Sequence, residues 1–384
     1  MFIILKRISI IIIITIFLLE IFGVILSSLR IIPNGSPAVM SIFAHKKWSL
    51  WHPKNISFKH HYNTCWGPTK ITFNNIGARG LRDVQIKKSK PRIALLGDSM
   101  IEMIHVKDGD DIGSLLQKKL PNYEVINFSS RGTGISDHLD IYKNLIKNYN
   151  IDYLIYYPSD NDLVNNFILS NEPDKIFNQP AFYFDEETNQ VIKINRNEKK
   201  MKKYFSNLNK IKRTKFVLYL KEYSYTFKIY YHIKTIIRNN KVQKIVFDEK
   251  KYADKKKQLP KQKKVYKHIM NKFIDEIEKD KINLITILNY KEYVFTEKND
   301  LSLKWKIRFD RFNFQKDLWQ NYNNAYYNLN EAKDYIKLNN NNIIKPFVNL
   351  GHVCDDHYSK YGSEFITNIS LKRINAYFEK EQNN

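Results

Sequence analysis

The chain has 384 residues, enough for one large domain or two moderate ones with a sizeable core. Its formal net charge is +24 at pH 7, yet no nucleic-acid-binding motif accompanies the lysines, which are spread along the chain among abundant Asn, Ile and Tyr. We therefore expect no nucleic-acid partner, while attraction to anionic lipid or acidic polysaccharide stays open. The cysteines and histidines lack metal-ligand spacing, so we expect no metal site and no cofactor.

An apolar run from Ile8 to Leu26 follows Lys6 and Arg7, and it is broken only by one Ser, one Thr, one Glu and one Gly. About 19 residues suffice to cross a hydrocarbon core of about 30 Å as a helix. The alternative is a cleaved signal peptide, but the segment after Val24 offers no convincing small-x-small cleavage site. We expect residues 1–30 to be an uncleaved signal anchor that spans the inner membrane once. The basic residues on its N-terminal side predict that the rest of the chain is extracytoplasmic, in the periplasm.

Residues 31–90 are predicted to be an extracytoplasmic lead-in segment, and from Pro91 short apolar runs alternate with amphipathic segments. The runs with the composition of buried strands are Ile93–Leu96, Val125–Phe128 and Tyr153–Tyr157. The segments with helical spacing between them are Ile112–Leu120 and Ser136–Lys147. Near-continuous apolar strands separated by helices are typical of a parallel sheet covered on both faces. We therefore predict an α/β fold, a three-layer α/β/α sandwich with a parallel sheet.

The alternation lapses in an insertion at about residues 170–264 of the predicted domain, which covers 91–384. Residues 181–194 have the pattern of a hairpin, and the run KYADKKKQLPKQKKVYK at 251–267 has that of a solvated linker and helix start. Residues 299–342 are aromatic and Asn-rich and match no element pattern. The remaining predicted elements are a helix at Tyr266–Glu278, a strand at Ile282–Leu288 and a final helix at Lys360–Phe378.

The chain has two cysteines, Cys65 and Cys354. In an exported domain such a pair forms either a disulfide, here one tying the early segment to a late loop, or two separate thiols. The sequence leaves both open, because it does not give the distance between the two residues.

Polar residues follow each predicted strand, at the place where doubly wound sheets bind their ligands. Gly97-Asp98-Ser99 follow the first strand, Gly132 lies in the loop after the second, and Asn161-Asp162 come after the third. His357 precedes the final helix. Taken singly, each has a simpler structural explanation, as a helix cap, a turn residue or a surface histidine. Their occurrence in order, three of them just past successive strands, favours a shared site.

These residue types suit acyl transfer. A serine hydroxyl is a weak nucleophile and needs a neighbouring base, normally a histidine oriented by a carboxylate. The tetrahedral intermediate needs hydrogen-bond donors aimed at its oxyanion, each contributing roughly 10²–10³ in rate. The N–H groups of Ser99 and Gly132 and the side-chain amide of Asn161 can supply three such donors. Gly132 has no Cβ, which lets the backbone approach a substrate closely.

The chain resembles the SGNH hydrolases, also called GDSL-type esterases and lipases, of the membrane-anchored bacterial type. The resemblance rests on GDS at Gly97 to Ser99, Gly132 after NFSSR, Asn161-Asp162 and His357, with NNIGARG at 74–80 also similar. It covers about 72–167 well and 267–378 loosely, and leaves the insertion out. It implies the three-layer, flavodoxin-like fold, with Ser99 as nucleophile, His357 as base, and Ser99, Gly132 and Asn161 as the oxyanion hole. The G-x-S-x-G elbow of α/β-hydrolases is absent.

The sequence departs from the family pattern at two positions. Many members place the orienting Asp three residues before the His, where this chain has Cys354. We assign that role to Asp355, a spacing that some polysaccharide-modifying relatives use, with Asp356 as the alternative and a Ser–His dyad as a further one. Ser159 stands where the third block often has Gly, which alters the lining of the pocket more than its chemistry.

The function expected from these residues is that of a membrane-anchored serine esterase or O-acyltransferase acting on acyl groups, acetyl above all, of cell-surface glycans. A lipase or lysophospholipase at the membrane surface is the alternative within enzymes. The third hypothesis for the function is a catalytically inert scaffold of a polysaccharide-export system. The expected partners are an acylated carbohydrate or lipid ester and the membrane. The sequence leaves the oligomeric state open.

Overall fold

The computed structural model describes residues 2–29, 43–44, 50–60, 69–165, 167, 181–194, 223–230, 233, 249–289, 303–322, 325–326, 328, 330–331, 334, 351–352 and 355–382. Both cysteines lie outside these residues, so the disulfide stays an open expectation. Most of the Lys- and Tyr-rich part of the predicted insertion lies outside them as well.

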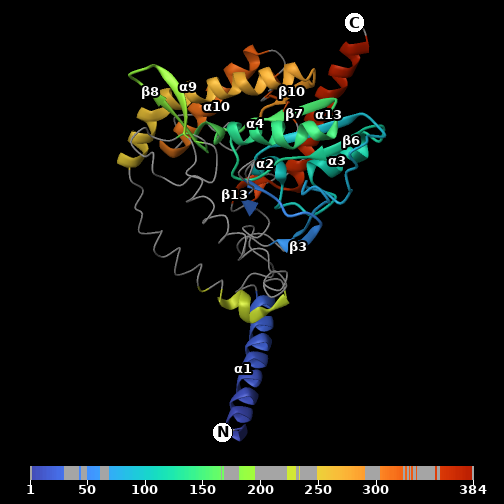
Figure 1. The fold of residues 1–384 in the computed structure, drawn as a ribbon, viewed down its shortest axis with the longest axis vertical. Coiled ribbons are helices and arrows are strands. Elements are labelled where there is room, and N and C mark those ends of the chain that lie inside the picture. The colour runs from blue at the N-terminus through green and yellow to red at the C-terminus, as the bar shows by residue number, and fades with distance from the viewer. Residues whose placement is uncertain are drawn as a thin grey trace.

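A five-stranded sheet, parallel throughout, forms the centre of the molecule (Figure 1). Its strand order is β11-β10-β7-β5-β6. With the strands counted along the chain, this is the 2-1-3-4-5 order of flavodoxin-like sheets, whose ligands bind where the order reverses, beside the first and third strands. The strands are β5 (Arg92–Gly97), β6 (Glu124–Asn127), β7 (Tyr153–Tyr157), β10 (Asn283–Ile287) and β11 (Ala325–Tyr326).

Helices cover both faces of this sheet. One face packs against α4 (Ile135–Asn144), α9 (Glu249–Lys279) and α10 (Leu303–Asn321), and the other against α3 (Ile112–Lys119) and α13 (Lys360–Gln382). The strands serve both layers because successive side chains point to opposite faces. In β5, Ala94 and Leu96 join the first core, and Ile93 and Leu95 join the second. The predicted three-layer α/β/α sandwich is confirmed.

The smaller elements lie around this sheet. The predicted hairpin is present as β8 (Ala181–Asp185) and β9 (Gln190–Ile194), and Asn189 in its turn has a left-handed backbone conformation (φ 53°). A 3-10 helix follows α4 at Ile146–Tyr149. The other small elements are α2 (Ser99–Glu102), α5 (Asp162–Asn165), β1 (Phe43–Ala44), β2 (Leu50–Trp51), β3 (Ile56–His60), β4 (Thr69–Phe73), β12 (Gly351–His352) and β13 (Asp355–Tyr358).

Two stretches differ from the sequence expectations. Helix α9 begins at Glu249 rather than near Tyr266, so the lysine-rich run with Pro260 is helix and not a solvated linker. The physical reason is packing: Leu259 is 8% exposed and joins the core that contains β8, and the Lys264 ammonium lies 4.1 Å from the centre of the Phe184 ring. Helix α10 occupies part of the 299–342 stretch that matched no pattern.

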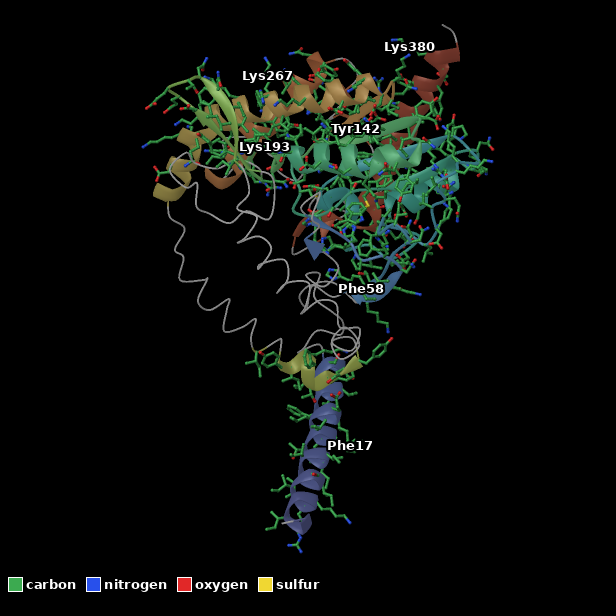
Figure 2. All side chains as sticks on the ribbon, in the orientation of Figure 1. Phe17, Phe58, Tyr142, Lys193, Lys267 and Lys380 are labelled. Atoms are coloured by element: carbon green, nitrogen blue, oxygen red, sulfur yellow. The ribbon has the colours of Figure 1, made fainter. Side chains whose placement is uncertain are left out.

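Helix α1 (Phe2–Ser28) projects away from the rest of the chain as a long apolar rod (Figure 1). Its segment Lys6–Ser28 is long and apolar enough to cross a membrane, a composition shared by membrane anchors and signal sequences. Figure 2 shows its side chains, including Phe17, directed outward rather than into a core. Phe17 is 64% exposed.

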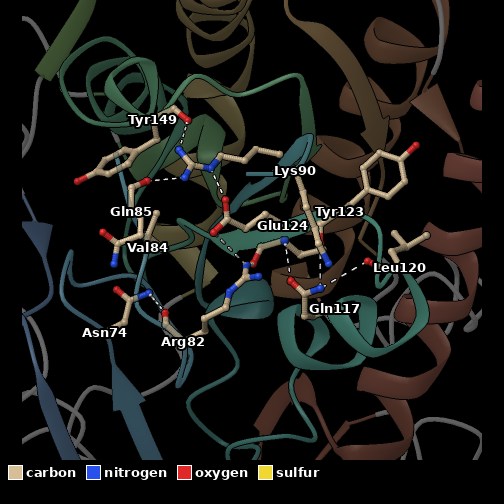
Figure 3. Close-up of polar contacts among 12 residues, drawn as sticks. Asn74, Arg82, Val84, Gln85, Lys90, Gln117, Leu120, Tyr123, Glu124 and Tyr149 are labelled. Atoms are coloured by element: carbon tan, nitrogen blue, oxygen red, sulfur yellow. Dashed lines mark hydrogen bonds and ion pairs between the residues drawn. The ribbon is translucent and has the colours of Figure 1, made fainter. Parts of the chain in front are cut away.

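A buried ion pair joins the amino ends of β5 and β6. Arg92, whose exposed fraction is 0%, pairs its Nε with the carboxylate of Glu124 and donates from Nη1 to the Tyr149 carbonyl at 2.6 Å. Figure 3 shows Glu124 also close to Arg82, whose Nη2 lies 3.9 Å from the second carboxylate oxygen. This network holds the amino ends of β5 and β6 together. The loops of the candidate site lie at the opposite, carboxyl edge of the sheet.

Candidate active site

Ser99 is the first residue of α2, directly after β5. The Asp98 side chain caps this helix by accepting a hydrogen bond from the Met100 N–H at 2.9 Å. Gly97 suits the tight turn, because a Cβ there would lie 3.0 Å from Cγ1 of Ile101 and 3.2 Å from the Tyr157 carbonyl oxygen. As the first helical residue, Ser99 has a backbone N–H without an intrahelical acceptor. The turn chemistry therefore belongs to Asp98, and the Ser99 side chain is available for another contact.

That contact is made with His357, on β13. The Nε2 atom of His357 lies 2.7 Å from Oγ of Ser99, within hydrogen-bond distance. The two residues are 258 positions apart in the chain and both are half-buried. The structure thus brings together the two residues that the sequence predicted as nucleophile and base, in the geometry that proton transfer between them requires.

Two further histidines stand behind His357, and sequence reasoning missed both. The His105 ring packs edge-on against the His357 ring, with 4.5 Å between the centroids, and the His60 ring lies 5.8 Å from that of His105. His60 and His105 are 1% and 6% exposed, so packing holds their rings in place. The His105 ring in turn limits the orientations open to the His357 imidazole. The sequence feature that could have pointed to His105 is its closeness to the predicted nucleophile, since it lies three residues past the end of α2.

Gly132 lies exposed in the loop between β6 and α4, with φ of +71°, a conformation that favours glycine. Hydrogen bonds tie this loop to the two other segments predicted to form the site. The Ser130 N–H donates to the Gly97 carbonyl at 3.1 Å, and the Asn165 side chain in α5 donates to the Thr133 carbonyl at 2.7 Å. The segments carrying Ser99, Gly132 and Asn161 are therefore joined at one edge of the sheet.

A buried cluster of Glu102, His52 and Arg131 holds the Gly132 loop in place. The Glu102 carboxylate, 0% exposed at the end of α2, accepts a hydrogen bond from the Arg131 N–H at 2.6 Å. It also lies 3.1 Å from His52 Nε2 and 3.7 Å from the Arg131 guanidinium. Burial raises the pKa of Glu102, but the charges of Arg131 and His52 outweigh it, so the net pKa is lowered to about 2. Glu102 therefore stays ionised, and it connects the loop to α2 and to the lead-in segment.

Asn161 lies at the start of α5, after β7. Its backbone carbonyl accepts hydrogen bonds from the Val164 and Asn165 N–H groups, at 2.9 and 3.0 Å. Within the described residues its side-chain Oδ1 is buried and has no hydrogen-bond partner, so the side chain does not cap the helix. The neighbouring Asp162 carboxylate instead accepts from the Ser159 N–H at 3.0 Å. The Asn161 amide oxygen is therefore a buried polar atom without a protein partner among the described residues.

Helix α10, which lies in a stretch that matched no element pattern, forms polar contacts with the loop that carries Asn161. The Arg308 guanidinium forms a two-pronged ion pair with the buried Asp160 carboxylate, Nε to Oδ2 at 2.7 Å and Nη2 to Oδ1 at 3.2 Å. The Gln315 amide donates to the Ser159 carbonyl at 2.9 Å. The two-pronged geometry fixes orientation as well as distance.

His138 is buried and contacts residues next to the candidate site, a role that the sequence did not predict. Its Nε2 is 3.0 Å from the Thr133 hydroxyl and its Nδ1 is 3.2 Å from the Tyr156 hydroxyl, which in turn donates to Asp162 at 3.2 Å. Burial lowers the pKa of His138 to about 4, against the opposing effect of the Asp98 charge. A neutral His138 therefore connects the Gly132 loop with the loop after β7.

The predicted orienting carboxylates lie on the same strand as the base. Asp355 and Asp356 belong to β13, which also carries His357, but their side chains are outside the described part of the structure. The choice between Asp355, Asp356 and a dyad stays a prediction.

No protein-family model matches this chain, and no curated protein matches it. Among solved structures, the chain is similar to the psychrotrophic esterase EstA from Pseudoalteromonas sp., in a structure inhibited by monoethylphosphonate. The TM-score is 0.37 and the sequence identity 10%, over 76% of this chain and 100% of the esterase chain. The chemistry proposed for the site rests on its own geometry.

Proposed function

We propose that this protein is a serine esterase or O-acyltransferase of the SGNH type that works through an acyl-serine intermediate. The observation that carries the proposal is the 2.7 Å contact between Ser99 Oγ and His357 Nε2. A hydroxyl at the start of a helix, at the carboxyl edge of a parallel sheet, with an imidazole in hydrogen-bond reach, is the arrangement that acyl transfer needs.

The proposed reaction assigns a role to each of these residues. His357 Nε2 takes the hydroxyl proton as Ser99 Oγ attacks the ester carbonyl, and the oxyanion accepts hydrogen bonds from the N–H groups of Ser99 and Gly132 and from the Asn161 amide. His357 then donates the proton to the departing alkoxide, which leaves acyl-Ser99. Water, or a sugar hydroxyl in the transferase case, then attacks the acyl carbonyl while His357 takes its proton. Collapse of this second tetrahedral intermediate breaks the bond between Ser99 Oγ and the acyl carbon, releases the acid or the new ester, and returns the proton from His357 to Ser99. Asp355 is assigned the orientation of the imidazole.

The proposed setting is the outer face of the inner membrane, with α1 as anchor, and the proposed substrates are acyl esters, acetyl above all, on cell-surface glycans. The composition of α1 and the basic residues Lys6 and Arg7 near its N-terminal end support this location.

The test is turnover of a chromogenic acetyl ester by the full chain in detergent, combined with labelling by a fluorophosphonate. Ser99→Ala is expected to abolish turnover and labelling. His357→Ala is expected to lower the rate by about 10²–10⁴-fold, the contribution of a general base. The same change at His268, a partly exposed residue of α9, is the control and leaves the rate unchanged.

Substrate choice comes from the same preparation. Acetyl found by mass spectrometry on an added oligosaccharide indicates a transferase, and acetate alone indicates a hydrolase. Turnover of long-chain esters only would replace the glycan substrate by a lipid. Turnover that persists in Ser99→Ala would overturn the proposal, as would a wild-type chain that neither turns over esters nor reacts at Ser99.

A further inference from the structure

One side of helix α1 is withdrawn from the surface near its C-terminal end. Gly23 is buried and Glu20 and Ser27 are half-buried, whereas their neighbours Ile21 and Phe22 are 44% and 53% exposed. Spacings of three and four residues place Glu20, Gly23 and Ser27 on one face of the helix. Part of the chain therefore covers this face.

The covering segment is residues 223–230, of which 225–230 are helical. The Glu20 carboxylate accepts hydrogen bonds from the Ser224 hydroxyl at 2.5 Å, the Tyr225 N–H at 2.6 Å and the Thr226 N–H at 3.2 Å. Gly23 permits the close approach, because a Cβ at this position would lie 2.4 Å from Cβ of Tyr225. A carboxylate and a glycine on the apolar helix thus fit one particular segment, far away in the sequence.

The depth of Glu20 fixes the depth of this segment. At about 1.5 Å per residue, α1 rises about 20 Å from Arg7 to Glu20, whereas a hydrocarbon core is about 30 Å thick. A helix that spans from Arg7 therefore holds Glu20 about 10 Å short of the far boundary. A carboxylate there is costly unless hydrogen bonds replace its water. The groups of residues 224–226 supply those bonds, so they must reach the same depth.

The exposed residues of the segment suit such a position. Tyr223 and Tyr230 are 57% and 56% exposed, and Ile233, just beyond, is 51% exposed. Lys228 is 6% exposed, and its ammonium packs 4.0 Å from the centre of the Tyr225 ring within the segment. Tyrosines with apolar bodies and polar tips are enriched at membrane–water interfaces. In Figure 1 this short helix lies across the end of α1.

We propose that residues 223–230 and 233 form a collar that dips into the leaflet at the C-terminal end of α1 and is held on α1 by Glu20 and Gly23. Its partner is the lipid of that leaflet, around the boundary between headgroups and acyl chains. Removal of α1 would take away the acceptor for three donors of the collar, so α1 is a retained anchor and not a cleaved leader. The inference rests on the membrane-anchored part of the proposed function and is independent of the chemistry at Ser99.

The test uses the full chain in nanodiscs of phosphatidylethanolamine and phosphatidylglycerol, with p-benzoylphenylalanine in place of Tyr230. Position 361 is the matched control, because Tyr361 on α13 is 59% exposed. Illumination is expected to give several-fold more lipid adduct at position 230 than at 361, on a chain whose intact mass includes α1. Equal adduct at the two positions, or a mature chain that starts after α1, would overturn the inference.

Substitutions in α1 test the docking itself. Glu20→Leu removes the acceptor and is expected to reduce lipid adduct at position 230 several-fold, while Glu20→Gln, which keeps one oxygen, retains more of it. Thr15→Leu, another polar-to-apolar change in the same helix, is the control and leaves the adduct unchanged. Adduct that is equally strong in Glu20→Leu would contradict the docking. Ester hydrolysis in the same discs is measured separately, so a failure of the serine chemistry is distinguishable from a failure of the collar.

Discussion

The Glu102 carboxylate lies 2.6 Å from the backbone nitrogen of Arg131, the residue before Gly132. Because Glu102 ends the short helix that Ser99 begins, one buried charge links the predicted nucleophile to the loop that is predicted to hold the oxyanion. The relationship gives Glu102 a positioning role, because it acts on the Gly132 loop through the backbone of Arg131.

Glu102→Gln keeps the shape of the side chain but removes its charge, so the Gly132 loop is held less firmly. We expect kcat for ester hydrolysis to fall about 10- to 100-fold, with a much smaller change in KM, because a small displacement of an oxyanion donor acts on the transition state. Steady-state kinetics measure both constants. Glu276→Gln is the control, because Glu276 lies on α9 in a partly exposed ion pair with Lys143 of α4. A Glu102→Gln enzyme with wild-type kcat would contradict the role.

The same carboxylate makes stability depend on acid. The folded pKa of Glu102 is about 2, below the ordinary value of 4.5, so its contribution is complete above about pH 4.5 and is lost as the pH falls towards 2. The full loss is about 3 kcal/mol. Denaturant unfolding of the wild type should show this decline, and Glu102→Gln should flatten it. An unchanged slope in the variant would place the acid sensitivity elsewhere.

His138 should respond in a different pH window. Its folded pKa of about 4 lies below the ordinary 6.5, so the unfolded chain takes up a proton first as the pH falls. Stability is therefore complete above about pH 6.5 and declines towards pH 4, by about 2 kcal/mol at pH 5. His138→Gln should reduce the slope between pH 7 and 5, and His268→Gln on α9 should change it far less. An NMR titration that finds His138 protonated at pH 6 would contradict this.

Arg308→Lys tests whether α10 positions the Asn161 loop. A lysine ammonium does not reproduce the two-pronged contact with Asp160, so the loop loses its fixed orientation. We expect kcat to fall about tenfold while the fold is retained in circular dichroism. Lys316→Gln, a change of a cation on the same helix, is expected to leave kcat unchanged. Equal kcat for Arg308→Lys and wild type would show that α10 is structural only.

The pair at the other edge of the sheet should matter for stability and not for chemistry. Arg92→Met leaves the Glu124 carboxylate mostly buried without its nearest cation, and we expect a loss of about 3–5 kcal/mol in the free energy of unfolding. Lys88→Met breaks a half-exposed pair with Asp152 and should cost about 1 kcal/mol or less. Denaturant titration measures both. Similar losses for the two variants would mean that the Arg92 network does not fix the sheet.

Local patterns in the sequence were sufficient for much of the fold. The apolar runs at β5, β6, β7 and β10, the helices α3 and α13, and the β8–β9 hairpin were predictable, because burial on both faces of a sheet or on one side of a helix leaves a regular pattern in nearby residues. The first half of α9 was not, since its helical state depends on packing against β8 and not on its own lysine-rich composition.

By itself the sequence determined the order of Ser99, Gly132, Asn161 and His357 along the chain and the strands that three of them follow. Only the tertiary structure decided that Ser99 and His357 meet at 2.7 Å and that Glu102, His138 and Arg308 support the loops around them. The physical reason is range. Periodicity records how each segment meets its immediate surroundings, whereas a contact across 258 residues depends on the order of strands in the sheet and on how the loops at its edge are joined.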